Sequence, residues 1–327
     1  MSLKDIIGQE KAVRMLFGIL KRQMAASSYL FCGEAGIGKK TAAVAFAKAM
    51  NCTRPIPPGP PFSSDSPVDA CNECASCAKI DSGVHPDFLL VSPEERLIRI
   101  EEIRMVDAAL SLKPFEGRKK TVIIDDAEAM NISAANAFLK TLEEPPAESV
   151  IILVSSKPDL LPATIRSRCS RINFSPLPAG PCRQVLSGSL ENTEKLDLAT
   201  RLSMGRPGMA LSSDLTEERA WFLDLFRSML LADKDAWSSR NDMERWFDHV
   251  LVFFRDMAVL KITNNSAHLI NADLEEYFSR LSKSLDVKVI IYIHQELSRL
   301  RRLLQFNLNK SITWNYTASL LRKELLL

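Results

Sequence analysis

The sequence predicts an α/β fold built on a parallel sheet, followed by a helical C-terminal part. Continuous apolar runs at 28–32, 121–124 and 150–156 lack the alternation of a half-exposed strand, which is typical of strands covered on both faces. Segments with apolar residues every three or four positions separate these runs. After Pro176 the strand patterns cease and helical patterns continue. We therefore expect one α/β unit first and helices after it.

Length and composition exclude several classes of protein. The chain has 327 residues, which is enough for two or three domains, and its charged residues leave a net charge of only +2. A charge this small argues against a protein that coats nucleic acid by charge alone. The N-terminus lacks the pattern of a signal peptide, and no apolar run approaches the ~20 residues of a membrane span. We expect a cytoplasmic protein with no membrane partner.

A glycine-rich loop follows the first apolar run and nearly matches the phosphate-binding pattern G-x-x-x-x-G-K-[ST]. In that pattern backbone N–H groups surround phosphates, the lysine reaches the outer phosphates, and the final hydroxyl binds Mg²⁺. Lys40 stands where the hydroxyl belongs, and its ammonium group would repel the metal. We expect a poor ATPase, while binding of ATP with Mg²⁺ stays open. The candidate nucleotide-binding residues of the loop are Gly33, Gly36, Gly38, Lys39, Lys40 and Thr41.

Polar residues end the next two apolar runs. Asp125 and Asp126 follow the run at 121–124, where one carboxylate can hold Mg²⁺ and a neighbour can orient attacking water. Alternatively, both acids interact with the N-terminal dipole of the following helix. Ser155, near the end of the run at 150–156, is a further candidate for the nucleotide site.

Four of the seven cysteines lie in one excursion from the core, which also contains a proline-rich insert at 53–61. Two overlapping C-x-x-C steps and one distant cysteine can place four thiolates at the corners of a tetrahedron, which suits structural Zn²⁺. The alternative is a set of free thiols on a loop. His85 would be a surplus fifth donor, so we expect it in a turn or a hydrogen bond. The candidate metal ligands are Cys52, Cys71, Cys74 and Cys77.

Several of these stretches occur in an order that resembles the bacterial clamp-loader ATPases, which are AAA+ proteins of the DNA polymerase III holoenzyme. They are the phosphate loop, the cysteine group, the acid-ended strand, AANAFLKTLEEPP at 134–146 and LLPATIRSRC at 160–169. The resemblance covers roughly residues 1–210. It implies a AAA+ P-loop domain at 1–175 with a four-cysteine zinc module at 52–77, a helical lid at 176–212, and an all-α collar domain at 213–327.

The resemblance also implies roles and partners. Arg168, in the Ser-Arg-Cys motif, would reach into the ATP site of a neighbouring subunit as a trans-acting arginine finger. The implied partners are the gamma/tau and delta subunits, the sliding clamp and, through the complex, primed DNA. The implied cofactor is structural Zn²⁺, whereas ATP with Mg²⁺ stays open.

Departures from the family pattern favour a ring-completing subunit over an ATP-hydrolysing gamma/tau-type motor. Motor subunits are expected to carry a hydroxyl, a glutamate and an arginine where this chain has Lys40, Asp126 and Gly208. Arg206 lies close enough to replace that arginine in part. We therefore predict a subunit of the polymerase holoenzyme with weak or no ATPase activity of its own. The motor subunit and a zinc-dependent nucleic-acid-binding adaptor are the alternatives.

Overall fold

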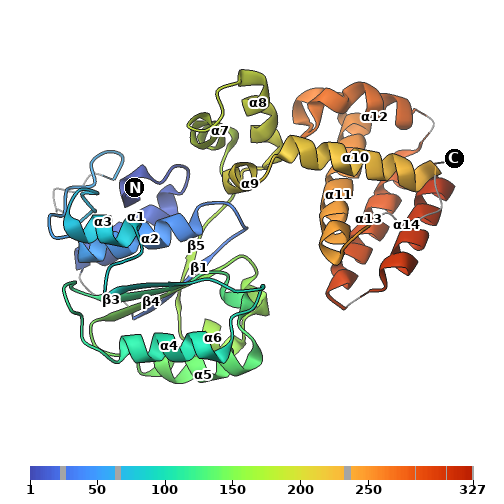
Figure 1. Cartoon of the computed structure of the whole chain (residues 1–327). Helices are drawn as coiled ribbons and strands as arrows, with labels where there is room; N and C mark the ends of the chain where they lie inside the picture. Colours follow the sequence, from blue (N-terminus) through green and yellow to red (C-terminus); the bar gives the residue numbers. More distant parts are fainter. Residues whose placement is uncertain (23–26, 63–67, 232–236, 284, 307, 326–327) are drawn as a thin grey trace. The chain divides into compact units, whose positions relative to one another are not determined.

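The computed structural model divides the chain into two compact units. The first comprises residues 1–188 and 205–209, and the second comprises 189–204 and 210–327. The first unit contains the sheet and the second contains only helices (Figure 1). The residues that the structure describes are 1–22, 27–62, 68–231, 237–283, 285–306 and 308–325, so part of the predicted zinc module, 63–67, lies outside them.

A five-stranded parallel sheet forms the centre of the first unit. Its order is β2-β3-β4-β1-β5, so β1 lies between β4 and β5. All residues of β1, β3 and β4 are buried, which explains their continuous apolar runs. The predicted α/β class is confirmed. The strands are β1 Ser28–Cys32, β2 Phe88–Val91, β3 Lys120–Ile124, β4 Ser149–Ser155 and β5 Ser170–Asn173.

Helices cover both faces of this sheet. Figure 1 shows α1 and α2 on one face and α4 and α5 on the other. The helix predicted from Thr41 begins at Lys39, because Gly38 is its N-cap, so both lysines of the loop belong to its first turn. The helices of this unit are α1 Glu10–Arg22, α2 Lys39–Asn51, α3 Ala75–Asp81, α4 Ile100–Leu110, α5 Ile132–Glu143, α6 Ala163–Arg166 and α7 Ala179–Ser187.

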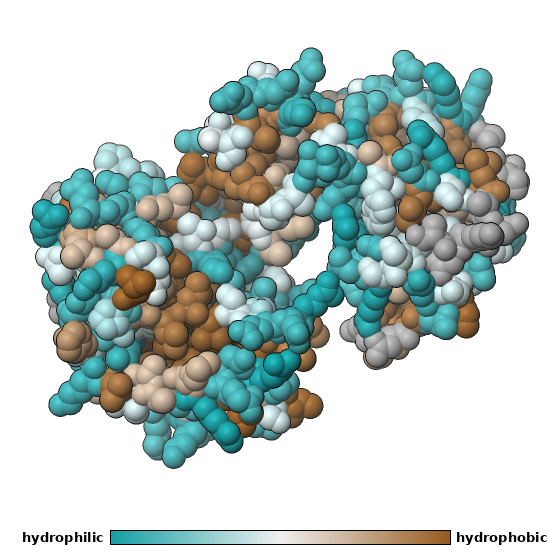
Figure 2. Space-filling view, in the orientation of Figure 1, coloured by the Kyte–Doolittle hydropathy of each residue, from teal (hydrophilic) through white to brown (hydrophobic). Residues whose placement is uncertain are grey.

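Aromatic side chains form the core of the second unit. Phe222 contacts Trp246 and Phe253, and the three side chains are at most 2% exposed. The predicted aromatic stripes are therefore core, while hydrophilic side chains cover much of the visible face (Figure 2). No helix in the described part of the chain is long and apolar enough to cross a membrane. The helices are α8 Thr193–Leu202, α10 Leu215–Leu231, α11 Arg240–Thr263, α12 Glu275–Leu281, α13 Val287–Leu303 and α14 Lys310–Glu324.

One short helix, α9 Pro207–Ser212, spans the boundary between the two units. The division into two units is coarser than the predicted division into three domains. The predicted boundaries after residues 175 and 212 therefore stay predictions.

Candidate functional site

The phosphate loop joins β1 to α2 at the carboxyl edge of the sheet. Gly36 and Gly38 have φ angles of +78° and +91°, in the left-handed region that glycine adopts without strain. Gly38 caps α2 with its backbone and has no side chain to bond the first N–H groups of the helix. Those N–H groups have no helical partner, which makes such a loop suited to an anion.

The two lysines of the loop point to different partners. Lys39 is 6% exposed, and its Nζ donates a hydrogen bond of 2.6 Å to the Glu34 carbonyl. Burial lowers the pKa of Lys39. Lys40 reaches the end of β3, where its Nζ lies 3.0 Å from Asp125 Oδ2 and 3.5 Å from Ser92 Oγ. Thr41 is exposed on the first turn of α2. The structure thus brings two of the predicted site residues, Lys40 and Asp125, into direct contact.

These residues do not fit a magnesium ion. The hydroxyl that would bind Mg²⁺ is absent, and the carboxylate that would face the metal is already paired with an ammonium group. A metal at this place would be a cation next to a cation. This loop therefore lacks the hydroxyl ligand and the unpaired carboxylate with which a complete phosphate loop holds Mg²⁺ for ATP hydrolysis.

Asp126 and Ser155 lie at the same edge of the sheet. Asp126 has a φ angle of +45° and forms no side-chain capping bond with the turn that follows it. Burial raises the pKa of Asp126, and the charges of Asp125 and Glu128 raise it further. Ser155 is fully buried, and its hydroxyl accepts a hydrogen bond of 3.2 Å from the Lys157 backbone.

Glu128 is a site residue that sequence reasoning missed. Its Oε1 accepts hydrogen bonds from the Ser156 backbone at 3.0 Å, the Ser156 hydroxyl at 2.6 Å and the Lys157 backbone at 3.0 Å. It therefore ties the end of β3 to the end of β4. Its position three residues after Asp125, within the same acidic stretch, was the available signal.

The segment 205–209 lies directly on the phosphate loop. The Gly208 backbone donates a hydrogen bond of 2.8 Å to the Gly36 carbonyl, and Arg206 Nη1 lies 3.6 Å from Glu34 Oε2. A Cβ atom at Gly208 would lie 2.8 Å from Gly36 Cα. The close approach leaves no room here for the arginine expected in a motor subunit.

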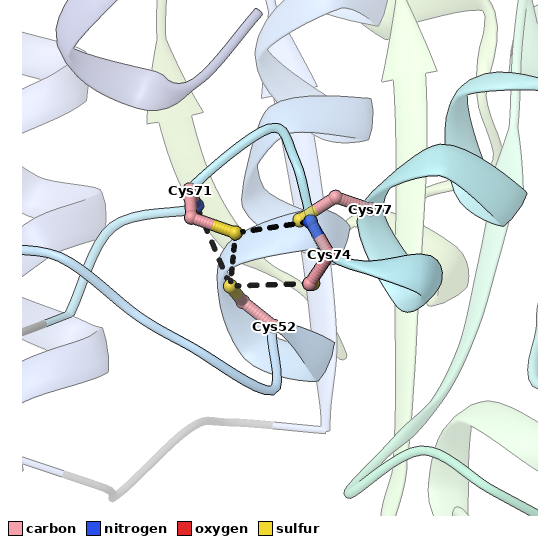
Figure 3. A group of neighbouring side chains, drawn as sticks. All are labelled: Cys52, Cys71, Cys74 and Cys77. Carbon is pink, nitrogen blue, oxygen red and sulfur yellow. Dashed lines mark hydrogen bonds between the residues drawn. The ribbon is translucent and has the colours of Figure 1, made fainter.

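The four predicted metal ligands come together at the start of α3. Their sulphur atoms all lie within 4.8 Å of one another, and Cys52 Sγ is 3.5 Å from Cys71 Sγ and 3.8 Å from Cys74 Sγ (Figure 3). Zn–S bonds of about 2.3 Å place tetrahedral sulphurs about 3.8 Å apart. Cys52, Cys74 and Cys77 are buried. The group therefore fits one metal ion held by four thiolates.

A buried lysine supports the cysteine group. Lys48, on α2, is fully buried, and its Nζ donates hydrogen bonds of 2.5 Å to Asp81 Oδ2 and 2.8 Å to Asn72 Oδ1. Asn72 lies between two of the cysteines, with a φ angle of +64°. Lys48 also donates to the Met1 carbonyl at 3.2 Å. One side chain thus connects α2, the cysteine loop, α3 and the N-terminus.

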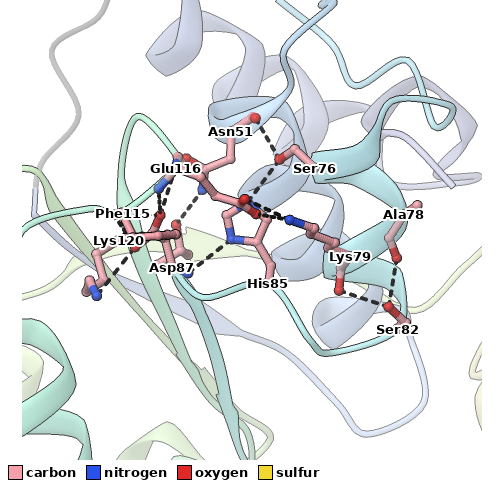
Figure 4. Close-up of polar contacts among 12 residues, drawn as sticks. Asn51, Ser76, Ala78, Lys79, Ser82, His85, Asp87, Phe115, Glu116 and Lys120 are labelled. Atoms are coloured by element: carbon pink, nitrogen blue, oxygen red, sulfur yellow. Dashed lines mark hydrogen bonds and ion pairs between the residues drawn. The ribbon is translucent and has the colours of Figure 1, made fainter.

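A second network holds the segment before β3 (Figure 4). The buried Asp87 carboxylate accepts hydrogen bonds of 2.7–3.0 Å from the backbone N–H groups of residues 115–117. Burial opposes ionisation of Asp87, but these backbone donors outweigh it and lower the pKa below its ordinary value. Asn51, next to Cys52, accepts a hydrogen bond of 2.9 Å from the Lys119 backbone through its side-chain oxygen.

His85 belongs to this network and not to the cysteine group, as predicted. Its Nδ1 accepts a hydrogen bond of 3.0 Å from the Asp87 backbone, so the ring proton resides on Nε2. Nε2 lies 3.1 Å from Ser76 Oγ and 3.5 Å from Glu116 Oε1. Because Nε2 already carries a proton, His85 cannot accept one from Ser76. The serine, histidine and glutamate are therefore structural and do not form a hydrolytic triad.

Arg168 lies apart from the phosphate loop of its own chain, just after α6. Its Nη2 is 2.5 Å from Glu143 Oε1, and its Nη1 donates a hydrogen bond of 2.8 Å to the Thr164 carbonyl. The side chain is 33% exposed. The structure of the single chain thus places the guanidinium group at the surface, against the end of α5.

Comparison with known proteins settles the family. The sequence profile of the family described as "DNA polymerase III, delta subunit" matches residues 8–178, which is more than half of the chain. The chain belongs to this family. The resemblance to clamp-loader proteins inferred from the sequence motifs is thereby confirmed.

Individual members of the DNA polymerase III group are similar over different lengths. A Pseudomonas aeruginosa protein named DNA polymerase III subunit delta' is 36% identical over 64% of the chain and 63% of its own length, which is less than two thirds of either. A Bacillus subtilis delta' is 28% identical over 81% of the chain and 82% of its own length. The Bacillus subtilis subunit tau is 37% identical over 52% of the chain, but the match spans only 28% of tau.

Solved structures resemble this family member only loosely over the whole chain. A gamma subunit-related protein from Thermotoga maritima has a TM-score of 0.45 at 18% identity, covering 95% of this chain and 99% of its own. The Bacillus subtilis clamp loader delta protein has a TM-score of 0.37 at 11% identity, covering 96% of this chain and 99% of its own.

We expect Lys48→Met to destabilise the cysteine loop of this family member. The substitution keeps the length of the buried stem but leaves the Asn72 and Asp81 oxygens without their donor, which should cost about 1–3 kcal/mol of unfolding free energy. Urea titration measures this loss. As a control, Lys119→Met removes a surface pair with Glu148 and should cost less than about 1 kcal/mol. Equal losses in the two variants would contradict a supporting role for Lys48.

Replacement of Asp87 by asparagine should change how stability depends on pH. The pKa of Asp87 in the folded chain lies below the ordinary value of 3.8. Its stabilisation is therefore complete above that value and is lost as the pH falls through the folded pKa. Asp87→Asn should be less stable by about 1–3 kcal/mol near neutral pH, and the gap should narrow below about pH 4.

Chemical denaturation across the acid range measures this gap. Asp159→Asn, which alters a 90% exposed carboxylate, is the control and should follow the wild-type curve. A gap for Asp87→Asn that stays constant into acid would rule out the assigned role of its charge.

Proposed function

We propose that this chain is a delta'-type subunit of a DNA polymerase III clamp loader. In this role it completes the ring that loads the sliding clamp onto primed DNA and has weak or no ATPase activity of its own. The observation that carries the proposal is the ion pair of Lys40 with Asp125, at the place where a motor subunit needs Mg²⁺. The alignments agree with this choice, since a delta' relative matches over 81% of the chain and tau over 52%.

The same proposal assigns cofactors and partners. Zn²⁺ is the structural metal of the cysteine group, whose four sulphurs have the spacing of a tetrahedral site. The partners are gamma/tau and delta subunits, with the sliding clamp and primed DNA engaged through the assembled ring in the cytoplasm. In this role the AAA+ phosphate loop of this chain is a structural part of the fold, and ATP is hydrolysed in neighbouring subunits.

The residue proposed to act on a neighbour is Arg168. Its guanidinium group is partly exposed and is held by Glu143 and the Thr164 carbonyl. Both contacts are at the surface, where an ion pair contributes about 0–1 kcal/mol. Little free energy therefore opposes a turn of the side chain toward the phosphates of another subunit, whose developing charge it would stabilise in the transition state.

The purified chain alone should not release phosphate from ATP in the presence of Mg²⁺. It should nevertheless co-elute with gamma/tau and delta subunits of the same source on size exclusion, and restore clamp loading to a ring that lacks it. Phosphate release by the single chain at the rate of a motor subunit would favour the motor alternative. Failure to enter the ring would contradict the proposed role itself.

Arg168→Ala should impair ATP hydrolysis in the reconstituted ring without unfolding this chain. An arginine finger accelerates phosphoryl transfer by about 10³-fold or more, so ATP hydrolysis at the neighbouring site should almost cease. Steady-state ATPase and clamp loading on primed DNA measure the effect. Arg166→Ala, two residues away in a surface pair with Asp159, is the matched control. If the ring containing Arg168→Ala hydrolyses ATP and loads clamps as fast as the ring containing Arg166→Ala, Arg168 does not act as an arginine finger.

A further inference from the structure

The exposed side of α1 carries positive charge that neither the phosphate loop nor the cysteine group uses. This helix has four basic residues and one acidic residue in 13 positions, whereas the whole chain has a net charge of only +2. Lys11, Arg14 and Arg22 are exposed and form no ion pair with an acid in the described part of the chain. The charge on this side of α1 is therefore available to a partner.

A hollow of about 630 Å³ follows this side of α1, along residues at helical spacing. A Cβ atom at Gly18, in the middle of the stripe, would meet no described atom within 4 Å, so the space above it is open. Met15 is 51% exposed, which places apolar surface between the charges. The described residues that line this first hollow are Lys11, Arg14, Met15, Gly18, Ile19 and Arg22.

A second hollow, of about 450 Å³, adjoins the first at Ile19, which lines both. Its volume is within the range of about 300–1,000 Å³ that is typical of ligand pockets. Phe46 and its neighbours on α2 form the apolar side, while Arg118 and the ion pair of Lys119 with Glu148, at 2.6 Å, form the charged side. Because residues 118, 119 and 148 precede β3 and β4, this hollow lies at the amino edge of the sheet, opposite the phosphate loop. It has room for one large apolar side chain.

We propose that the two hollows form one docking groove for an acidic peptide segment of a partner protein. An aromatic side chain of the peptide enters the second hollow, and carboxylates on either side of it contact the cations of α1 and Arg118. Charge complementarity selects this occupant, since Glu148 is the only acid among the described residues that line either hollow and is already paired with Lys119. The cations guide and orient the peptide, and the buried aromatic anchor supplies most of the affinity.

The apolar positions of the groove favour a peptide over a nucleic acid backbone. Phosphates gain from Lys and Arg but gain nothing from Met15 and Ile19, which lie between the cations. A peptide with an aromatic residue uses both, because burial of the ring removes apolar surface from water. The opposite side of α1 is fixed in the core, where Ala12, Val13 and Leu16 are at most 1% exposed. The groove is thus preformed, which lowers the entropic cost of binding.

Fluorescence anisotropy on the full-length chain tests the groove, which belongs to the single chain and does not depend on ring assembly. The probes are the labelled peptide Asp-Asp-Glu-Trp-Asp-Glu-Asp and its forms with phenylalanine or alanine at the centre. We expect a Kd of about 1–100 μM for at least one aromatic peptide, and binding of the alanine peptide that is weaker by about tenfold or more. If neither aromatic peptide binds, or if a mixed-sequence DNA duplex binds more tightly than both, the proposal is wrong.

Two matched pairs of variants locate the binding. Gly18→Trp fills the first hollow and should weaken binding of the aromatic peptide about tenfold, whereas Gly18→Ala should keep the wild-type affinity. Arg14→Glu should also weaken binding about tenfold. Lys21→Glu makes the same change of charge on the same helix, but Lys21 lines neither hollow, so at ~0.15 M salt its effect should stay below about threefold.

Circular dichroism checks that each variant is folded, and the wild-type titrations do not rely on the variants. Equal losses in Arg14→Glu and Lys21→Glu would indicate a general effect of charge and would contradict a groove along α1. Wild-type affinity in Gly18→Trp would contradict it as well.

Discussion

The parallel pairing of β1 between β4 and β5 is the constraint on which the candidate sites depend. It sets the end of β1, and with it the glycine loop, beside the end of β4, while β3 adds its acidic end on the far side of β4. Because every strand runs the same way, their polar termini collect at one edge while their apolar middles stay buried. The loop, Asp125 and Ser155 are neighbours for this reason alone.

At that edge Lys40 occupies the position of the hydroxyl that binds Mg²⁺ in a complete phosphate loop. The ammonium group of Lys40 and the carboxylate of Asp125 form an ion pair, so each charge is balanced by a partner within the protein. In an ordinary phosphate loop the protein supplies the ligands and the solvent supplies the cation. Here the chain itself places an ammonium group, that of Lys40, beside the carboxylate of Asp125.

Much of the fold and part of the sites could be predicted because they rest on local patterns. The strand bounds followed from apolar runs, and the cysteine group from its spacing. By contrast, Lys48 and Asp87 were missed, since each acts through partners in other segments of the chain. From sequence alone, a lysine in an alanine-rich helix is expected to be exposed to solvent, whereas the fold buries Lys48 completely. The pairing of Lys40 with Asp125 likewise required the strand order.

The cysteine group is connected to more of the chain than its own loop. Asp69, two residues before Cys71, accepts hydrogen bonds of 3.0 Å from the backbone of Leu3 and Lys4. Asn51, next to Cys52, holds the backbone before β3. The cysteine group thus lies between residues that hold the amino terminus and residues that hold the backbone before β3, and we expect oxidation of its thiols to loosen both segments.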